Sequence, residues 1–193
     1  MPEAMKYSGN GMIQKIKSHT EPLIPGKKLL RDFFIRDVLE VAPEMVGKNL
    51  VVILPDGSIG RYMVTEVEAY RGNDDKACHA FKGRTSRTEI MFHQGGHLYI
   101  YLIYGMYWML NVVTGLADVP QAVLIRGVGV FDGPGKLTKS LGIDNSYYGL
   151  DLVQSDRIWL EDTGVRTDFK TGQRIGIEYA GEYWSSRPWR FYI

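Results

Sequence analysis

The stretch Gly95–Ala117, GGHLYIYLIYGMYWMLNVVTGLA, contains no Asp, Glu, Lys or Arg, and the uncharged run extends back to Ile90. Its length suits a membrane-spanning helix. However, four tyrosines, a tryptophan and an asparagine are spread through it, whereas tyrosines in a bilayer gather at its interfaces. β-Branched and aromatic residues favour strands instead. We therefore predict two buried strands, Leu98–Ile103 and Trp108–Val113, joined as a hairpin around YGMY (residues 104–107).

The segments around this hairpin predict one α+β domain with a largely antiparallel, curved sheet and flanking helices. Residues 1–28 are expected to be a flexible arm, and residues 29–193 a single domain. We predict a helix from about Leu29 and a short second helix that begins at Pro43 and ends at Gly47. Further elements are predicted in NLVVILPDGSIGRYMVTEVEAY (residues 49–70, a hairpin), AVLIRGVGVF (122–131, a strand), GPGKLTKSLGI (133–143, a turn and helix), RIWLED (157–162), RIGIEYAG (174–181) and RPWRFYI (187–193), the last three as strands.

Composition and charge bear on the cellular compartment and the binding partners of the protein. The one cysteine, Cys78, cannot form an internal disulfide and suits a reducing compartment. The N-terminal residues lack the apolar core of a secretory signal, so we expect a cytoplasmic protein, or a nuclear one in a eukaryote. The net charge of +1 points to no particular partner. The run Lys76–Arg87 carries four cations and no acid, which suits a phosphate-facing loop or an ordinary solvated loop.

The segment VTEVEAY (residues 64–70) places two carboxylates and a tyrosine on one side of a strand. Strict alternation puts Val64, Glu66, Glu68 and Tyr70 on one face and the residues between them on the other. If that face is buried, a carboxylate there has a raised pKa and can act as a general base. If it is exposed, the same residues are only a solvated strand face.

The histidines and glycines do not form a known metal or nucleotide motif. His93 and His97 are four residues apart, but Gly95 and Gly96 disfavour a helix that would align them. GPGKL lacks the first glycine of a Walker motif and has Leu137 where Ser or Thr should follow the lysine. We therefore predict no metal site and no cofactor. The backbone N–H groups that open this helix remain candidates for binding a phosphate.

The tyrosines of the hairpin allow two interpretations. Tyr99 and Tyr101 lie two apart on one strand and share a face, and Tyr104 falls at the turn. Such side chains form either an ordinary core or a stacking slot for a flat π-system, with the turn residue protruding as a wedge.

Several segments together resemble the alkyladenine (3-methylpurine) DNA glycosylases. They are EVEAYRGNDDKACHA, MFHQGGHLYIYLIYGMYWMLNVV, AVLIRGVGV, GPGKLTKSLGI and RIGIEYAGEYWSSRPWRFYI, which occur in the family's order over residues 29–193. The resemblance implies that the hairpin inserts into the minor groove of DNA. Tyr104 matches the intercalating tyrosine, and Met106 follows it in the turn. The basic loop (Arg84 and Arg87) and Lys136 are then expected to contact phosphates.

The resemblance also implies roles for the residues that bind and release the damaged base. Those that stack on the flipped base match Tyr70, His79 and Tyr101. Asn111 matches the residue that crowds the exocyclic amine of guanine. Glu68 matches the general base, and Arg126 an arginine beside the attacking water. No lysine falls at a matching catalytic position, so no Schiff-base lyase step is expected.

The function implied is a monofunctional glycosylase of base excision repair. It flips alkylated or deaminated purines (3-methyladenine, 7-methylguanine or hypoxanthine type) out of double-stranded DNA and hydrolyses the N-glycosidic bond. A monomer without a membrane partner is expected. Two alternatives stay open: a noncatalytic module that binds damaged DNA or modified nucleotides, and a structural module with an aromatic core.

Overall fold

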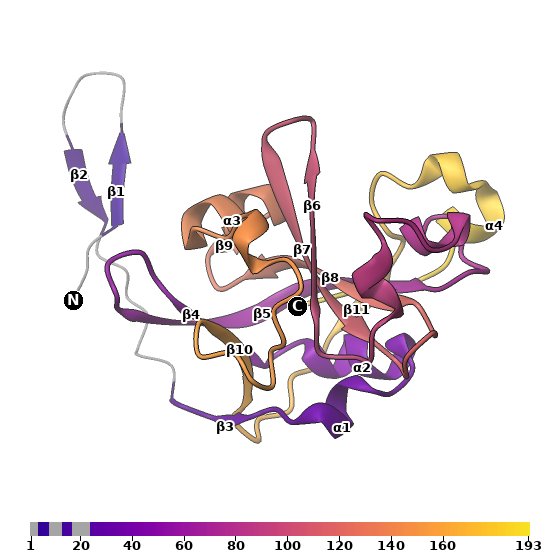
Figure 1. Ribbon diagram of the computed structural model, residues 1–193. Helices are drawn as coiled ribbons and strands as arrows, with labels where there is room; N and C mark the ends of the chain where they lie inside the picture. The colour runs from indigo at the N-terminus through magenta and orange to yellow at the C-terminus, as the bar shows by residue number, and fades with distance from the viewer. Residues whose placement is uncertain (1–3, 8–12, 17–23) are drawn as a thin grey trace.

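The computed structural model describes residues 4–7, 13–16 and 24–193, and Figure 1 shows the arrangement of the elements. Strands β1 (Ala4–Tyr7) and β2 (Ile13–Ile16) pair only with each other within the described residues. The other described strands form one ten-stranded sheet: β3 (Lys27–Lys28), β4 (Asn49–Ile53), β5 (Ile59–Arg71), β6 (Leu98–Ile103), β7 (Tyr107–Thr114), β8 (Gln121–Val128), β9 (Phe131–Asp132), β10 (Ile158–Asp162), β11 (Lys170–Gly172) and β12 (Arg190–Tyr192). The helices are α1 (Arg31–Phe34), α2 (Val38–Met45), α3 (Pro134–Leu141) and α4 (Glu182–Ser185), with 3₁₀ helices η1 (His79–Lys82), η2 (Glu89–Phe92), η3 (Asn145–Tyr147) and η4 (Glu178–Ala180).

The sheet is antiparallel at every pairing, which confirms the predicted α+β class. Its main path runs β3-β10-β4-β5-β8-β7-β6. The 13-residue strand β5 is the link between its parts. Residues 59–63 of β5 pair with β4, whereas the later residues pair with β8 and also with β12. The segment that follows the predicted hairpin turn therefore meets the last strand of the chain.

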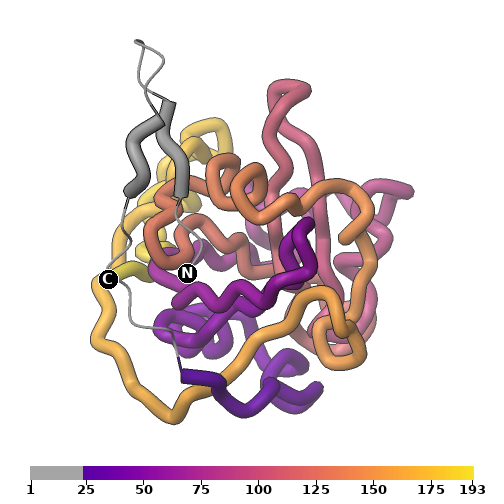
Figure 2. Tube along the Cα trace, turned by 90° about the vertical axis from the view of Figure 1, so that its left-hand side faces the viewer, coloured from indigo at the N-terminus to yellow at the C-terminus, as the bar shows by residue number. Residues whose placement is uncertain are grey.

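The predicted aromatic hairpin is present as β6 and β7, which project beyond the rest of the sheet in two perpendicular views (Figures 1 and 2). Its turn is tight, because the Met106 N–H donates to the Ile103 carbonyl at 3.1 Å. Tyr104 and Gly105 both have positive φ, 50° and 68°. Glycine adopts that conformation freely, but for a tyrosine it costs energy. The hairpin tip is therefore built around an unfavourable backbone at its tyrosine.

The first helical segment differs from its prediction in two places. The expected helix from Leu29 is interrupted after α1, and α2 begins at Val38 rather than at Pro43. The reason is Asp37, whose carboxylate accepts the Leu39 N–H at 2.9 Å and so caps α2. Pro43 lies inside α2.

Most of the other predicted elements are confirmed, with two exceptions among the strands. The strand predicted at 122–131 ends at Val128 in β8, because Gly129 has a φ of +53° and the chain turns back into β9. Helix α3 opens at Pro134, as the glycine-rich turn predicts, and ends at Gly142 in the left-handed conformation. The segment 174–181 is a loop followed by η4, not a strand, because Gly176 has a φ of +74° that interrupts extended backbone. The flexible arm predicted for residues 1–28 falls partly on residues 1–3, 8–12 and 17–23, which lie outside the described residues, and it stays a prediction.

The two faces of the sheet have different contents. One face carries the main core, in which Val67, Ile125 and Leu110 pack beneath α2 and α3. The other face carries a smaller cluster of Cys78, Met91 and Tyr99 with their neighbours, and it holds the candidate site. None of the helices in the described ranges has the length and apolar character needed to span a membrane.

Candidate active site

The site residues lie on one face of the sheet because the register of four strands aligns them. Glu68 on β5 lies opposite Leu124 on β8. Leu124 lies opposite Asn111 on β7, which in turn lies opposite Tyr99 on β6. Residues directly opposite in antiparallel strands point to the same face. Side chains that are more than 50 residues apart in the sequence therefore meet in one row.

Strand β5 departs from strict alternation just before the site. Register shifts on both sides of Glu66 mark a bulge in its pairing with β8. The sequence predicts Val64 on the same face as Glu66 and Glu68, but Val64 packs in the main core with Val67 and Ala69. That prediction is wrong because a bulge adds one residue and reverses the alternation.

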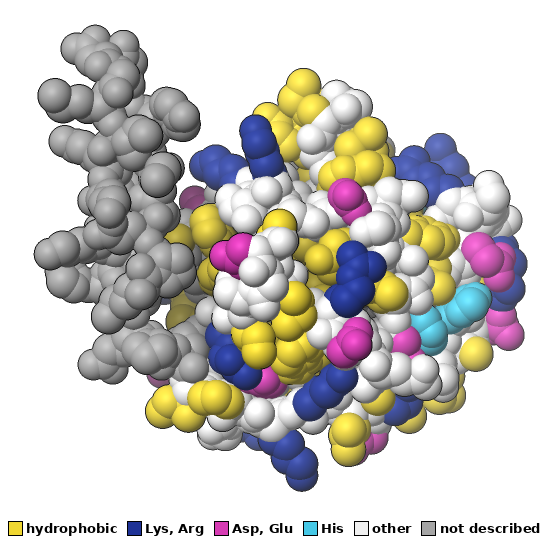
Figure 3. Space-filling view, turned by 60° about the vertical axis from the view of Figure 1, so that its left-hand side comes forward, with side chains coloured by type: hydrophobic (Ala, Val, Ile, Leu, Met, Phe, Trp, Pro, Cys, Tyr) yellow, Lys and Arg dark blue, Asp and Glu magenta, His cyan; other side chains and the backbone are white. Residues whose placement is uncertain are grey.

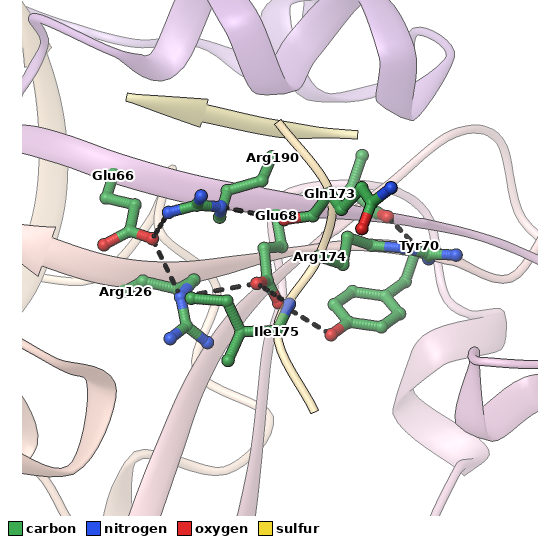
Figure 4. Close-up of polar contacts among 9 residues, drawn as sticks. Glu66, Glu68, Tyr70, Arg126, Gln173, Arg174, Ile175 and Arg190 are labelled. Atoms are coloured by element: carbon green, nitrogen blue, oxygen red, sulfur yellow. Dashed lines mark hydrogen bonds and ion pairs between the residues drawn. The ribbon is translucent and has the colours of Figure 1, made fainter. Parts of the chain in front are cut away.

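Glu68 is completely buried and is held by two hydrogen-bond donors and one ion pair (Figure 4). The Tyr70 hydroxyl donates to its Oε2 at 2.8 Å, and the Ile175 backbone N–H donates to its Oε1 at 2.8 Å. The Nε of Arg126 lies 3.4 Å from Oε1 and 3.1 Å from an oxygen of Glu66. The alternative of an exposed strand face is therefore wrong for Glu68.

Burial raises the pKa of Glu68 above its ordinary value of 4.5 and is the largest influence on it. Arg126, the Ile175 N–H and the Tyr70 hydroxyl oppose the rise, and the nearby carboxylate of Glu66 adds to it. A carboxylate with a raised pKa binds a proton more strongly than an exposed one. Glu68 thus has the proton affinity that suits a general base.

A small cavity lies near Glu68, and all the residues predicted to bind the base line it. Its lining is Tyr70, Ala77, Cys78, His79, Met91, Tyr99, Tyr101, Asn111 and Ala122. Glu68 itself does not line it; Tyr70 connects the two, since its ring lines the cavity and its hydroxyl donates to Glu68. The cavity holds about 20 Å³, which is room for roughly one water and not for a purine. A purine could therefore enter it only if its walls moved.

His79 and Tyr101 together form one wall of this cavity. Their ring centroids are 4.6 Å apart at an interplanar angle of 67°, which is too close for a base to lie between them. The Nδ1 of His79 is 2.8 Å from the Tyr99 hydroxyl. Burial, followed by the charges of Arg87 and Lys82, lowers the pKa of His79 to about 4. The imidazole is therefore neutral at physiological pH.

Asn111 is buried at the floor of the cavity in a fixed orientation. Its Nδ2 donates to the carbonyl of Tyr99 at 3.0 Å and to that of Met109 at 3.2 Å. Both N–H bonds of the amide are used, so the side chain cannot rotate away without losing them. A group that enters the cavity meets an amide of constant shape.

The hairpin tip presents apolar side chains to solvent. Tyr104 is 85% exposed and Met106 is 65% exposed. Figure 3 shows hydrophobic side chains gathered at the top of the molecule, where the hairpin projects. Exposed apolar protrusions mark interaction sites in soluble proteins. The exposure of Tyr104, together with its positive φ, sets it apart from the other hairpin tyrosines.

The predicted phosphate contacts differ in their surroundings. Arg84 pairs with Glu89 and with Asp118 and lies over the Phe92 ring. Arg87 has no ion pair within the described residues, and its guanidinium lies 5.2 Å from the Tyr101 ring centroid. Arg87 also lines a cleft of about 390 Å³ with Lys76 and Lys82, and this cleft shares Cys78 and His79 with the small cavity lined by Tyr70 and Tyr101. Lys136 is exposed on α3.

The sequence did not predict that residues near the C-terminus, between 174 and 190, contact the carboxylates of the site. Ile175 acts through its backbone N–H, so no side-chain pattern indicates it. Arg190 on β12 donates to Glu66 at 3.1 Å, and Arg174 pairs with Asp75 behind Tyr70. The only available signal was that these arginines fall in segments of the family resemblance. Among the described residues, no group of three or more His, Cys, Asp or Glu side chains is arranged to hold a metal ion.

Comparison with known proteins gives a consistent result. The family model described as "Methylpurine-DNA glycosylase" matches residues 32–133 and 128–193. Similar proteins named "Putative 3-methyladenine DNA glycosylase" include three from different organisms. The protein of Methanocella arvoryzae is 42% identical over 191 residues, covering 89% of this chain and 92% of its own. Those of Rickettsia felis and Clostridium novyi are 42% and 38% identical, each covering 86% of this chain and 92% and 95% of their own length. The chain therefore belongs to the methylpurine-DNA glycosylase family of DNA-repair enzymes.

Proposed function

We propose that this chain is a monofunctional DNA glycosylase that extrudes alkylated or deaminated purines from duplex DNA and hydrolyses their N-glycosidic bond. The observation that carries the proposal is the buried Glu68, joined through Tyr70 to an aromatic cavity. Two residues of that cavity, Tyr99 and Tyr101, lie on β6, the strand that leads to the exposed Tyr104. Its substrates are of the 3-methyladenine, 7-methylguanine and hypoxanthine type. It acts as a monomer on double-stranded DNA.

The first step is extrusion of the damaged nucleotide. Extrusion costs a few kcal/mol, and less for a damaged or mispaired base. Tyr104 at the hairpin tip fills the gap in the base stack, with Met106 beside it. Because both are exposed before DNA arrives, insertion requires no unpacking of the core.

The extruded base is held by stacking. One face packs on Tyr70 and the other on the wall made by His79 and Tyr101. Each stacking contact contributes about 1–3 kcal/mol. A cationic alkylpurine gains an additional cation–π attraction, which the neutral imidazole of His79 does not oppose.

Selection against normal purines is assigned to Asn111. Guanine carries an exocyclic amine at the 2-position, and adenine and hypoxanthine do not. The amide of Asn111, fixed by two hydrogen bonds, crowds that amine and disfavours guanine. 7-Methylguanine carries the same amine, but its positive charge makes it a better leaving group, which offsets the crowding.

Cleavage of the glycosidic bond uses the ionised form of Glu68. It accepts a proton from the attacking water, and its negative charge stabilises the oxocarbenium-like sugar that develops as the base departs. Arg126, held between Glu66 and Glu68, keeps Glu68 ionised and lies beside the water. Charged alkylpurines leave as neutral bases and need no proton. Hypoxanthine leaves as an anion that takes up a proton from solvent, and Glu68 releases to solvent the proton that it accepted from the water. The products are a free base and an abasic site.

Phosphates of the DNA backbone are assigned to cations that are free to bind them. Lys76, Lys82 and Arg87 line one cleft next to the base cavity, and Lys136 lies exposed on α3. Arg84 is expected to contribute less, because two carboxylates already neutralise it.

The test is excision from a duplex oligonucleotide that carries hypoxanthine or an alkylpurine. Wild-type protein should release the base and leave a strand that breaks only after alkali treatment. Strand breakage without alkali means that a lyase step occurs and that the monofunctional assignment is wrong. Retention of the lesion duplex without breakage after alkali identifies the noncatalytic binding module instead.

A further inference from the structure

A fully buried ion pair lies behind the cavity, between Asp75 and Arg174. The Nη2 of Arg174 donates a hydrogen bond to Asp75 Oδ1 at 3.0 Å, and its Nη1 donates one to the Ala69 carbonyl at 2.9 Å. Its Nε, also buried, has no partner among the described residues. A well-packed apolar pair of similar volume is often as stable as a buried ion pair. Fold stability alone therefore does not account for this arrangement.

The guanidinium of Arg174 is held between two aromatic rings. Its central carbon lies 4.8 Å from the ring centroid of Tyr70 and 5.0 Å from that of Trp189 (Figure 4 shows Arg174 beside Tyr70). Tyr70 lines the base cavity, whereas Arg174 does not. A flat guanidinium against one face of Tyr70 fixes the plane of the ring and leaves the cavity side for a base.

The residue after Arg174 holds Glu68. The Ile175 N–H donates to Glu68 Oε1 at 2.8 Å. Strand β11 ends at Gly172, and Gly176 has a positive φ, so no strand pairing holds this N–H in place. The bonds made by the Arg174 side chain are the nearest buried restraint on it.

Asp75 extends the same restraint to the loop that carries His79. One carboxylate oxygen accepts the Ala77 N–H at 3.0 Å, and the other accepts the Arg71 N–H at 3.2 Å. Ala77 lies two residues before His79, and both line the cavity. The pair thus joins the segment that holds Glu68 to the loop that forms a wall of the cavity.

We propose that Arg174, held by Asp75, is a positioning residue, and this proposal rests on the proposed function. Arg174 fixes the orientation of the Tyr70 ring, and it also fixes the position of the Ile175 N–H that donates to Glu68. One buried side chain then couples recognition of the base to the orientation of the carboxylate that activates water.

The test is Arg174→Lys, which keeps a cation beside Asp75 but removes the flat, forked group. Loosening of the Ile175 N–H removes a donor to the charged form of Glu68. The pKa of Glu68, measured by ¹³C NMR of its carboxyl group in the free protein, should rise by about 0.5–1 unit, the size of one hydrogen bond. The acidic limb of the single-turnover pH–rate profile should move by the same amount. Capture of a hypoxanthine duplex should weaken roughly fivefold as Tyr70 stacking is lost.

The matched control is Arg61→Lys, which alters another arginine–carboxylate pair with two hydrogen bonds, that of Arg61 with the buried Glu161. It should leave the pKa of Glu68, the pH profile and lesion capture unchanged. If Arg174→Lys changes thermal stability alone and matches Arg61→Lys in all three measurements, Arg174 is structural and the proposal is wrong. If wild-type protein excises no base, the proposed function fails, while the NMR titration still decides the role of Arg174.

Discussion

The variant Tyr104→Ala tests whether Tyr104 acts as a wedge in DNA or as part of the hydrophobic core. Tyr104 is 85% exposed, so Tyr104→Ala removes about 30 Å² of burial from a side chain of about 200 Å². At about 25 cal/mol per Å², the loss of unfolding free energy is at most about 0.8 kcal/mol. Alanine has the same difficulty as tyrosine at a φ of 50°, so the backbone contribution does not change.

The defect of Tyr104→Ala should appear only on duplex DNA. With 2-aminopurine beside the lesion, wild-type protein should raise the fluorescence as the base leaves the stack. Tyr104→Ala should give a smaller rise and weaker lesion capture, because nothing fills the gap that extrusion leaves. Capture of the same lesion in a single strand, where no stack has to be held open, should change little.

Two comparison variants make this result specific. Tyr104→Gly removes the same side chain and relieves the positive φ, so it should be at least as stable as Tyr104→Ala and equally defective. Tyr101→Ala removes a cavity wall and should cost about 1–3 kcal/mol of stability while weakening capture in both kinds of DNA. Unfolding of Tyr104→Ala, or base extrusion equal to that of wild type, would show that the wedge assignment is wrong.

Three further outcomes follow from the site. Asn111→Ser should allow measurable excision of guanine from mispairs with alkyladenine activity largely kept; loss of all activity would instead show that Asn111 supports the fold. Arg87→Gln and Lys136→Gln should each lower the log–log salt slope of DNA binding by about 0.9, and Arg84→Gln by less, because Arg84 is already paired; equal slopes for all three would contradict this. Because the pKa of Glu68 is raised in the folded state, its pH-dependent contribution to stability is present below about pH 4.5 and is lost as the pH rises through the folded pKa. The free energy of unfolding of Glu68→Gln, measured in urea, should therefore increase relative to that of wild type across that range.

Local patterns in the sequence were sufficient for most strands and for the aromatic hairpin. The uncharged aromatic run at residues 95–117 predicted β6 and β7 because alternating β-formers without charges are typical of buried strands. Helix α3 followed from the proline and glycines around it. The start of α2 differs from its prediction because proline is common in the first turn of a helix, which indicates Pro43, whereas the cap made by Asp37 decides where the helix begins.

The site itself required information that no local pattern contains. Alternation placed Glu68 correctly relative to Tyr70, but the bulge at Glu66 moved Val64 to the core. The contact that holds Glu68 comes from Ile175, 107 residues away, through a backbone N–H that any residue except proline supplies. Periodicity cannot indicate such a contact, because it depends on the tertiary arrangement of β5 and the C-terminal segment.

The measurement that tests the central claim most directly is single-turnover excision by wild type, Glu68→Gln and Glu66→Gln on one hypoxanthine duplex. Glu68→Gln keeps the shape of the side chain and removes its basicity. We expect it to lower the excision rate about 100-fold or more, as for loss of a general base, while binding of the lesion duplex is kept. Glu66→Gln should have a much smaller effect, because Glu66 contacts Arg126 and Arg190, whereas Glu68 is the carboxylate that accepts from the cavity residue Tyr70. Excision by Glu68→Gln at the wild-type rate, or an equal loss in Glu66→Gln, would contradict the assignment of Glu68 as the base.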